Sequence, residues 1–172
     1  MLREVEAIDH PRSWAKRFFS EDLRLSKITV IVPTLNEEEN IDLLLERIFR
    51  VRRSCSLDFE VLFVDSASKD ATCEKVRAWQ DREPVRLLRR DVNLGLAGAV
   101  IAGAMATTET WVLVMDADLS HPPEMIPDLL EPLLAGTYDM VIGSRYVTGG
   151  STPDWPLSRR ISSRLATYPA LL

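Results

Sequence analysis

The 172-residue sequence predicts an α/β fold in which a mostly parallel sheet carries helices on both faces. Two observations lead to this fold. Short runs of β-branched and other apolar residues recur along the chain, and each is followed by a segment whose apolar residues have helical spacing. The runs also lack the alternation of apolar and polar residues that marks a half-exposed strand, so we expect strands buried on both faces.

The first strand and helix fall within residues 28–53. The run Ile-Thr-Val-Ile-Val at residues 28–32 predicts a strand, which Pro33 ends. We expect Asn36 to cap the following helix and the three glutamates at residues 37–39 to fill its first turn. Arginines in its last turn match the helix dipole at the other end.

The same unit repeats towards the C-terminus. Further strands are expected at residues 59–64, 85–88, 111–115 and 138–142. Helices are expected at residues 68–82, with Ser68 as the cap, and at residues 96–107 and 123–135. Gly95, Gly98 and Gly103 do not follow the first strand, as a dinucleotide-binding fingerprint requires, and close packing of helix on sheet explains them better.

Composition and charge exclude several classes of protein. The net charge of −5, with a pI of about 5.1, argues against nucleic-acid binding through bulk positive charge. Cys55 and Cys73 are too few for a disulfide framework and fit a reducing cytosol. The longest apolar stretch, residues 94–106, is shorter than the roughly 20 residues that a transmembrane helix needs.

The sequence divides into three parts. Residues 1–26 have weak periodicity and are interpreted as an N-terminal extension, whereas residues 27–150 hold the strands and helices described above. Residues 151–172 are interpreted as an amphipathic, basic tail helix. From residue 145 onwards the net charge is +3, so the residues before it carry −8.

Ligands of a parallel sheet bind beyond the carboxyl ends of its strands, and an acidic pair lies at one of these ends. Asp116 and Asp118 follow the strand expected at residues 111–115. Side chains two residues apart on an extended backbone point the same way, so we expect the two carboxylates to converge and to hold Mg²⁺ or Mn²⁺ against a diphosphate. The alternative is a pair of solvated loop acids or helix caps, but the end of a buried strand favours the metal site.

Other strand ends leave alternatives open. The turn at residues 33–37 would offer backbone N–H donors to a nucleotide, although helix capping is favoured for Asn36. Asp65 either accepts hydrogen bonds from a base or ribose, or caps the next helix. His121 is a general base, a metal ligand or a loop residue.

Glycines and arginines follow the last expected strand. The paired glycines of residues 143–150 suggest a mobile loop, and its arginine is suited to bidentate binding of phosphate. Arg160 and Arg164, four residues apart, would share a helix face that contacts anionic lipid, or they are ordinary surface arginines.

Five motifs occur in order between residues 27 and 165, namely VIVPTLNEEENI, FVDSASKDAT, NLGLAGAVIAG, WVLVMDADLSHPPEMIPDLL and DMVIGSRYVTGG. Together they resemble the inverting family 2 glycosyltransferases with a GT-A Rossmann-like fold, and within them the dolichol-phosphate or polyprenyl-phosphate mannosyltransferases. The resemblance implies that residues 27–150 form a nucleotide-sugar-binding domain. It also implies metal-dependent transfer of a hexose, above all mannose, from GDP-mannose or a UDP-hexose to a polyprenyl phosphate. Such an enzyme would be cytoplasmic, peripheral at the cytoplasmic face of a membrane, and without a nucleic-acid partner.

The resemblance also implies roles for individual residues. The nucleotide would lie along Pro33, Leu35, Glu37, Val64, Asp65, Ser66 and Ala117. The metal, Mg²⁺ or Mn²⁺, would be held by Asp116, Asp118 and Ser120. Asp118 would also be the carboxylate nearest the transfer, while Arg145 and Arg159 would bind the acceptor phosphate and Arg145 would act as a catalytic residue.

This sequence departs from the family pattern in several places. Ser66 replaces the second Asp of an Asp-Asp-Gly-Ser motif, Ser120 replaces a Gln of the metal shell, and Leu35 replaces an aromatic residue. The family also continues well past Leu172, with a further acceptor-binding segment. Two alternatives therefore stay open: a truncated, non-catalytic relative that binds nucleotide or a partner, and an enzyme whose acceptor region is supplied by a partner chain. A nucleotidyltransferase is disfavoured because no Gly-rich, basic loop follows the first strand.

Overall fold

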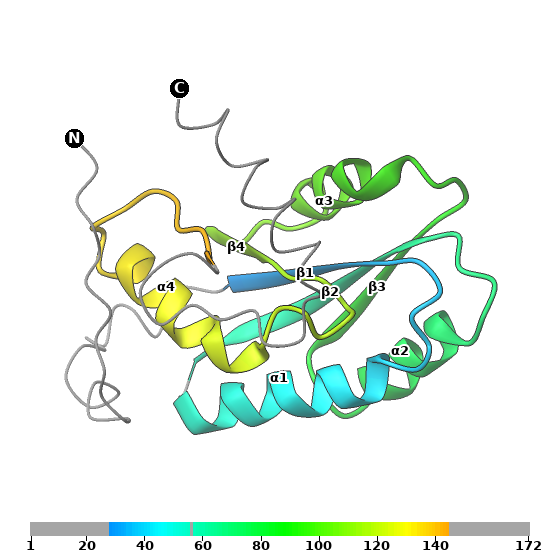
Figure 1. Cartoon of the computed structure of the whole chain (residues 1–172), viewed down its shortest axis with the longest axis horizontal. Helices are drawn as coiled ribbons and strands as arrows, with labels where there is room; N and C mark the ends of the chain where they lie inside the picture. The colour runs from blue at the N-terminus through cyan, green and yellow to red at the C-terminus, as the bar shows by residue number, and fades with distance from the viewer. Residues whose placement is uncertain (1–27, 56, 145–172) are drawn as a thin grey trace, which may run out of the picture. The chain divides into compact units, whose positions relative to one another are not determined.

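The computed structural model describes residues 28–55 and 57–144, and the fold is built on a four-stranded parallel sheet with strand order β3-β2-β1-β4. The strands are β1 (Ile28–Thr34), β2 (Phe59–Ser66), β3 (Val85–Arg90) and β4 (Trp111–Val114). The helices are α1 (Ile41–Cys55), α2 (Thr72–Gln80), α3 (Gly95–Met105), the short 3₁₀ helix η3 (Pro123–Met125) and α4 (Ile126–Leu134). Figure 1 shows α1 and α2 on one side of the sheet and α3 on the other, which confirms the predicted α/β class.

Strand β1 lies between β2 and β4 and pairs in parallel with both. Ile28 is opposite Phe59 of β2 and Trp111 of β4. The chain runs from β1 outwards to β2 and β3, and α3 then carries it back to β4 on the other side of β1. The strand order therefore reverses between β1 and β4, and sheets of this kind bind ligands beyond the carboxyl ends of the strands at such a point.

The side chains of β1 alternate between two apolar cores. Val30 and Val32 lie in the larger core, together with residues of α1, α2 and α4. Ile31 points to the opposite face and packs with Val64 of β2 and Ala99 of α3. The central strand therefore has no solvated face, as its unbroken β-branched run predicts.

Helix α3 approaches the sheet closely at Gly103. A Cβ atom at this position would lie 2.8 Å from Cγ2 of Ile31 and 3.0 Å from Cγ2 of Val64. The prediction that the glycines serve close helix–sheet packing is therefore confirmed at Gly103. Gly95 has another role, because it begins the helix with φ +75°, a conformation that favours glycine.

Helices α1 and α2 are joined by a hydrogen-bonded carboxylate and by a stacked aromatic pair. The Trp79 indole N–H donates a hydrogen bond to Oδ1 of Asp42 at 2.9 Å, and Nζ of Lys75 lies 3.0 Å from Oδ2 of the same carboxylate. The hydrogen bond from Trp79, followed by that from Lys75, lowers the pKa of Asp42. The ring of Trp79 also stacks on Phe49 with centroids 6.3 Å apart. These contacts fix α2 against α1 on the same face of the sheet.

The predicted starts of α1 and α2 are wrong. α1 begins at Ile41, so the glutamates of residues 37–39 lie in the preceding loop and Asn36 is not the cap. The carbonyl of Asn40 accepts the hydrogen bond from Leu44 N–H in the first turn. α2 begins at Thr72, several residues after Ser68. The side chains of Asn36 and Ser68 instead accept hydrogen bonds from N–H groups of another loop, and such bonds of Ser, Asn and Asp commonly compete with helix formation.

The strand predicted at residues 138–142 is also wrong, because this segment is irregular and forms no ladder with β4. The N–H groups of Thr137 and Tyr138 donate to the carbonyl of Pro132 at 3.1 and 3.3 Å. Gly136, with φ +67°, turns the chain there. The end of α4 therefore uses the first N–H groups of the segment, and Tyr138 and Met140 remain exposed.

Two of the expected parts, the N-terminal extension and the basic tail, lie outside the described residues. Of the helices between residues 28 and 144, none combines the length and apolarity needed to cross a membrane.

The Gly103→Ala substitution tests the contact between α3 and the sheet. Helix propensity alone would raise the free energy of unfolding by about 1 kcal/mol. Because the new methyl group would press on Ile31 and Val64, we expect a loss of about 1–2 kcal/mol instead, as overpacked cores show. Urea unfolding shows whether the free energy of unfolding rises or falls. A more stable variant would contradict the close approach of α3 to the sheet.

Candidate active site

Three loops leave the carboxyl ends of β1, β2 and β4, and each contains one non-glycine residue in the left-handed region. These residues are Asn36 (φ 56°), Ala67 (φ 65°) and Leu119 (φ 61°). Asn tolerates this conformation, whereas Ala and Leu each incur roughly 1–2 kcal/mol. Such strained residues gather at functional sites, so their distribution marks this edge of the sheet as the candidate site.

The loop after β1 is held by side chains of the loop after β2. Three backbone N–H groups donate to these side chains: Asn36 to Oγ of Ser68 at 2.8 Å, Glu37 to Oγ1 of Thr72 at 2.8 Å, and Glu38 to Oδ2 of Asp70 at 3.1 Å. The expectation that this turn offers backbone N–H donors to a nucleotide is therefore wrong for these three groups, because each already has an acceptor within the protein.

Hydrogen bonds also run in the opposite direction. The N–H of Lys69 donates to Oδ1 of Asn36 at 2.9 Å, and the N–H of Ala71 donates to Oε2 of Glu38 at 2.7 Å. Asn36 therefore links two loops instead of capping α1. We call this reciprocal set of hydrogen bonds, formed by residues 36–38 and 68–72, the loop clamp.

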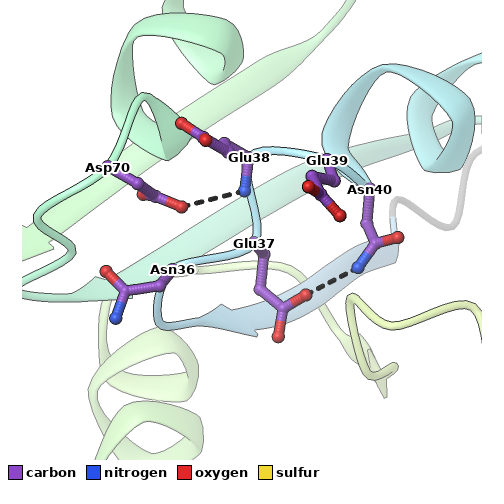
Figure 2. A pocket seen from close by; sticks show the side chains of 6 residues that line it. All are labelled: Asn36, Glu37, Glu38, Glu39, Asn40 and Asp70. Atoms are coloured by element: carbon purple, nitrogen blue, oxygen red, sulfur yellow. Dashed lines mark hydrogen bonds between the residues drawn. The ribbon is translucent and has the colours of Figure 1, made fainter.

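A small acidic pocket of about 180 Å³ adjoins the loop clamp and is lined by Asn36, Glu37, Glu38, Glu39, Asn40 and Asp70. In Figure 2 the Glu37 side chain turns towards Asn40, whose Nδ2 donates to Oε2 of Glu37 at 2.8 Å. Burial opposes ionisation of Asp70, but hydrogen bonds from Thr72 and Glu38 outweigh it and lower the pKa of this carboxyl. Four carboxylates around one hollow would repel a diphosphate, so the pocket is not suited to that group.

Asp65, at the end of β2, shapes the loop that follows. Its side chain is fully buried, and Oδ1 accepts a hydrogen bond from Ser68 N–H at 3.0 Å. Burial, followed by the hydrogen bond to Asp65, raises the pKa of the Cys73 thiol to about 11. Asp65 therefore shapes the loop and does not cap α2, which begins at Thr72, while its hydrogen bonding to a base or ribose stays a prediction.

The residues expected along the nucleotide differ in exposure. Leu35 is exposed, and Pro33 and Glu37 are half-buried. Val64, Asp65, Ser66 and Ala117 are buried. Pro33, which lies within β1 instead of ending it, and Leu35 and Glu37 after the strand keep accessible side-chain surface. The other four side chains are enclosed at the strand ends.

The loop after β4 does not have the extended backbone that the sequence predicts. β4 ends at Val114, and Ala117 and Asp118 form a turn. The N–H of Asp116 donates to Nδ1 of His121 at 3.1 Å, and Nε2 of His121 lies 3.6 Å from Oδ2 of Asp116. In this structure His121 orients Asp116 as a loop residue, and its roles as general base or metal ligand stay predictions.

The far end of this loop is fastened to α1. Nε of Arg47 donates to Oε1 of Glu124 at 3.0 Å, and Nη2 donates to the second carboxylate oxygen. The hydrogen bond from Arg47 lowers the pKa of Glu124, although partial burial opposes it. This bidentate pair ties η3 to α1 and so limits movement of the segment that carries the two aspartates.

The oxygens of Asp116, Asp118 and Ser120 suit a hard divalent cation. Asp116 is half-buried, Asp118 is exposed, and Ser120 N–H donates to Oδ1 of Asp118 at 2.9 Å. Within the described residues no three His, Cys, Asp or Glu side chains surround one point, so a cation held by Asp116 and Asp118 would need further ligands. Mg²⁺ and Mn²⁺ commonly complete such a set with phosphate oxygens and water. Arg145 and Arg159 lie outside the described residues.

A family model for Glycosyl transferase family 2 matches residues 29–171. The chain belongs to this family. Two curated relatives are a dolichol-phosphate mannosyltransferase of Pyrococcus furiosus, 43% identical over 80% of this chain, and an undecaprenyl-phosphate mannosyltransferase of Micrococcus luteus, 42% identical over 85%. The chain spans 38% and 60% of their lengths, respectively.

A family relationship is also visible in three dimensions. The mannosyltransferase PcManGT of Pyrobaculum calidifontis, whose structure contains GDP-Man and Mn²⁺, superposes with a TM-score of 0.54 at 31% identity. The superposition covers 66% of this chain and 33% of that one. The Rossmann-like α/β fold expected of a family 2 glycosyltransferase is therefore confirmed.

Glu38, Asp70 and Thr72 are members of the loop clamp, a role that the sequence did not predict for any of them. Asp70 stands just before α2 and Thr72 is its first residue, a spacing of two at which Asp side chains bond the backbone N–H two residues on. That pattern predicts a local turn. It does not reveal that the same carboxylate also reaches Glu38 in another loop.

The Ala67→Gly substitution tests the backbone strain. Glycine adopts φ 65° without a steric penalty but loses more entropy on folding, so we expect the free energy of unfolding to rise by about 0.5–1 kcal/mol. Ala71→Gly, at φ −81° in the same loop, is the matched control and should lower it. Equal effects of the two changes in urea unfolding would show that Ala67 is unstrained.

The Asp70→Asn substitution tests the loop clamp. Both carboxylate oxygens accept hydrogen bonds from backbone N–H groups, so the NH₂ group of an asparagine would face one of these donors without an acceptor. We expect the free energy of unfolding to fall by about 1–2 kcal/mol. Asp81→Asn, at the far end of α2, should change little. Folding lowers the pKa of Asp70, so the excess in free energy of unfolding of the wild type over Asp70→Asn should be fully present above the unfolded pKa of about 3.9. It should be lost as the pH falls through the lower pKa of the folded state. Unfolding across pH 3–7 measures this, and a pH-independent difference contradicts it.

Proposed function

We propose that this chain is the nucleotide-sugar-binding part of an enzyme that transfers mannose from GDP-mannose to a polyprenyl phosphate. The observation that carries the proposal is the similarity, at 42–43% identity over at least 80% of the chain, to relatives named as mannosyltransferases of dolichol and undecaprenyl phosphate. The GDP-Man in the structure of PcManGT supports the choice of donor. A UDP-hexose is the alternative donor, since Ser66 is uncharged where the family pattern has Asp.

In this proposal Asp116, Asp118 and Ser120 hold a divalent cation. Their oxygens are of the type that Mg²⁺ and Mn²⁺ prefer, and the Mn²⁺ of PcManGT supports metal dependence. When bound, the cation would neutralise charge on the diphosphate leaving group. The nucleotide would contact Pro33, Leu35 and Glu37 with their side chains, above the buried ends of β2 and β4.

The acceptor side of the proposal concerns the basic end of the chain. Arg145 and Arg159 would bind the acceptor phosphate, and the net charge of +3 beyond residue 144 supports an anionic ligand there. A phosphate oxygen is already an anion, so transfer needs positioning and charge neutralisation more than a general base. We place the enzyme at the cytoplasmic face of a membrane, because a polyprenyl phosphate resides in one.

The Asp118→Asn substitution tests the metal site. Calorimetric titration with GDP-mannose should show binding that needs Mn²⁺ in the wild type, and the loss of one ligand charge should weaken it by about tenfold or more. Asp81→Asn, the same change far from the site on α2, should bind like the wild type. Equal Mn²⁺-dependent affinity of all three proteins would rule out Asp118 as a ligand.

Turnover distinguishes an enzyme from a binding protein. The full chain is incubated with radiolabelled GDP-mannose or UDP-glucose, Mn²⁺ and polyprenyl phosphate, and lipid-extractable label is counted. We expect label from GDP-mannose. Metal-dependent nucleotide binding without any lipid-linked sugar would leave the non-catalytic alternative.

A further inference from the structure

We propose that Arg47 of α1 is a positioning residue for the divalent cation of the candidate site, and that it acts through Glu124. This inference rests on the proposed function, because it takes Asp116 and Asp118 as ligands of the cation. The guanidinium of Arg47 contacts Glu124 of η3, so its effect on the cation is indirect. We call residues 115–122, which connect β4 to η3, the aspartate loop.

The start of the aspartate loop is fixed to the sheet. The N–H of Met115 donates to the carbonyl of Ile31 in β1 at 3.0 Å. The side chains of Met115 and Ala117 are both buried. These contacts do not by themselves fix Asp118 and Ser120, which come later in the loop. The position of these two residues therefore also depends on how the other end of the loop is held.

The other end of the aspartate loop passes through two prolines. Pro122 has φ −64° and ψ 122°, and Pro123, the first residue of η3, is buried. Glu124 follows directly. Because the proline ring fixes φ, these residues form a stiff link between the loop and Glu124. Holding the Glu124 side chain therefore also holds the end of the loop.

Arg47 holds Glu124 from a firmly packed helix. Its neighbours Leu44 and Ile48 in α1 are fully buried in the larger core. Nε of Arg47 donates to one carboxylate oxygen of Glu124 at 3.0 Å, and Nη2 donates to the other. Surface ion pairs as a class contribute little to stability, but a bidentate pair fixes the orientation of the carboxylate as well as its distance. Arg47 therefore sets the position of η3 relative to α1.

A strained residue in the middle of the aspartate loop shows why its ends matter. Leu119, with φ 61°, lies between Asp118 and Ser120. A branched side chain in this region persists only where the surrounding structure enforces it. Relaxation of Leu119 to a negative φ would turn Asp118 and Ser120 relative to each other. Fixing both ends of the loop therefore keeps the oxygens of these two residues in the arrangement proposed to hold the cation.

Titration of the full chain with Mn²⁺, alone and with GDP-mannose, tests this inference. We expect Arg47→Gln to raise the dissociation constant of Mn²⁺ about tenfold, the lower end of the loss seen when a residue that supports a metal ligand is removed. Saturating Mn²⁺ should restore the affinity for GDP-mannose, because the residues proposed to contact the nucleotide are unchanged. Arg47→Lys should weaken Mn²⁺ binding less, since it retains the charge without the bidentate geometry.

A double variant tests whether Arg47 acts through Glu124. Glu124→Gln alone should raise the dissociation constant of Mn²⁺ as much as Arg47→Gln does. The combination of the two changes should be no worse than either one, because both remove the same contact. Additive effects would overturn the assignment of Glu124 as the intermediary.

The same helix offers a closely matched control. Nη2 of Arg52 pairs with Asp58 at 2.6 Å, and these side chains are 27% and 52% exposed, against 26% and 52% for Arg47 and Glu124. The Arg52 pair lies before β2, so Arg52→Gln should leave the affinity for Mn²⁺ unchanged. Unchanged affinity in Arg47→Gln, or equal weakening by both variants, would overturn the inference. Circular dichroism confirms that each variant is folded.

Amide hydrogen exchange separates failure of this inference from failure of the proposed function. The N–H groups of Asp116 and Ser120 are hydrogen-bonded within the aspartate loop. Without metal or nucleotide, Arg47→Gln should speed their exchange by about threefold or more, and Arg52→Gln should not. A wild type that binds no Mn²⁺ would refute the proposed function, and this inference with it, whatever the exchange rates. Mn²⁺ binding by the wild type, with exchange and affinity unchanged in Arg47→Gln, would refute the inference alone.

Discussion

The positions of the site loops depend on hydrogen bonds that two of them exchange. Glu37 N–H donates to the Thr72 hydroxyl, and that hydroxyl donates in turn to Asp70, so one carboxylate orients a chain of donors from another strand end. Hydrogen bonds in such a series polarise one another, so each one strengthens its neighbours. The cost of holding Ala67 in a left-handed conformation is offset by these contacts. The N–H groups of residues 36–38 in the loop after β1 are therefore already hydrogen-bonded, so these residues would contact a ligand through their side chains.

Burial and periodicity were enough to predict the four strands and the parallel sheet from the sequence. The β-branched run of β1 is buried on both faces, and the position of Gly103 follows from close packing. Local polar chemistry was harder to predict. Asn36 is a good cap residue in isolation, but its side chain accepts a hydrogen bond from Lys69, 33 positions away. The sequence near Asn36 does not indicate this long-range contact.

The candidate site could be predicted only in part for the same reason. The acidic residues after β4 were found because two aspartates at a strand end are a local pattern. Their backbone was predicted incorrectly, because His121 accepts the Asp116 N–H and Ala117 and Asp118 enter a turn. The segment at residues 138–142 has strand-like composition, but the end of α4 engages its neighbouring N–H groups. Hydrogen bonds between residues five or six positions apart overrode strand propensity in both places.

The strand order has a consequence for the order in which the site is assembled. β2 and β3 can pair soon after β1, whereas β4 joins β1 only after α3 has crossed the sheet, with about 80 residues between Ile28 and Trp111. Contacts that close such long loops form late and reopen early. β4 is also a four-residue strand, shorter than β1 or β2, so amide hydrogen exchange should be faster in β4 than in β1. The two aspartates therefore lie beside the part of the sheet that opens most easily, and a bound cation and nucleotide would stabilise it.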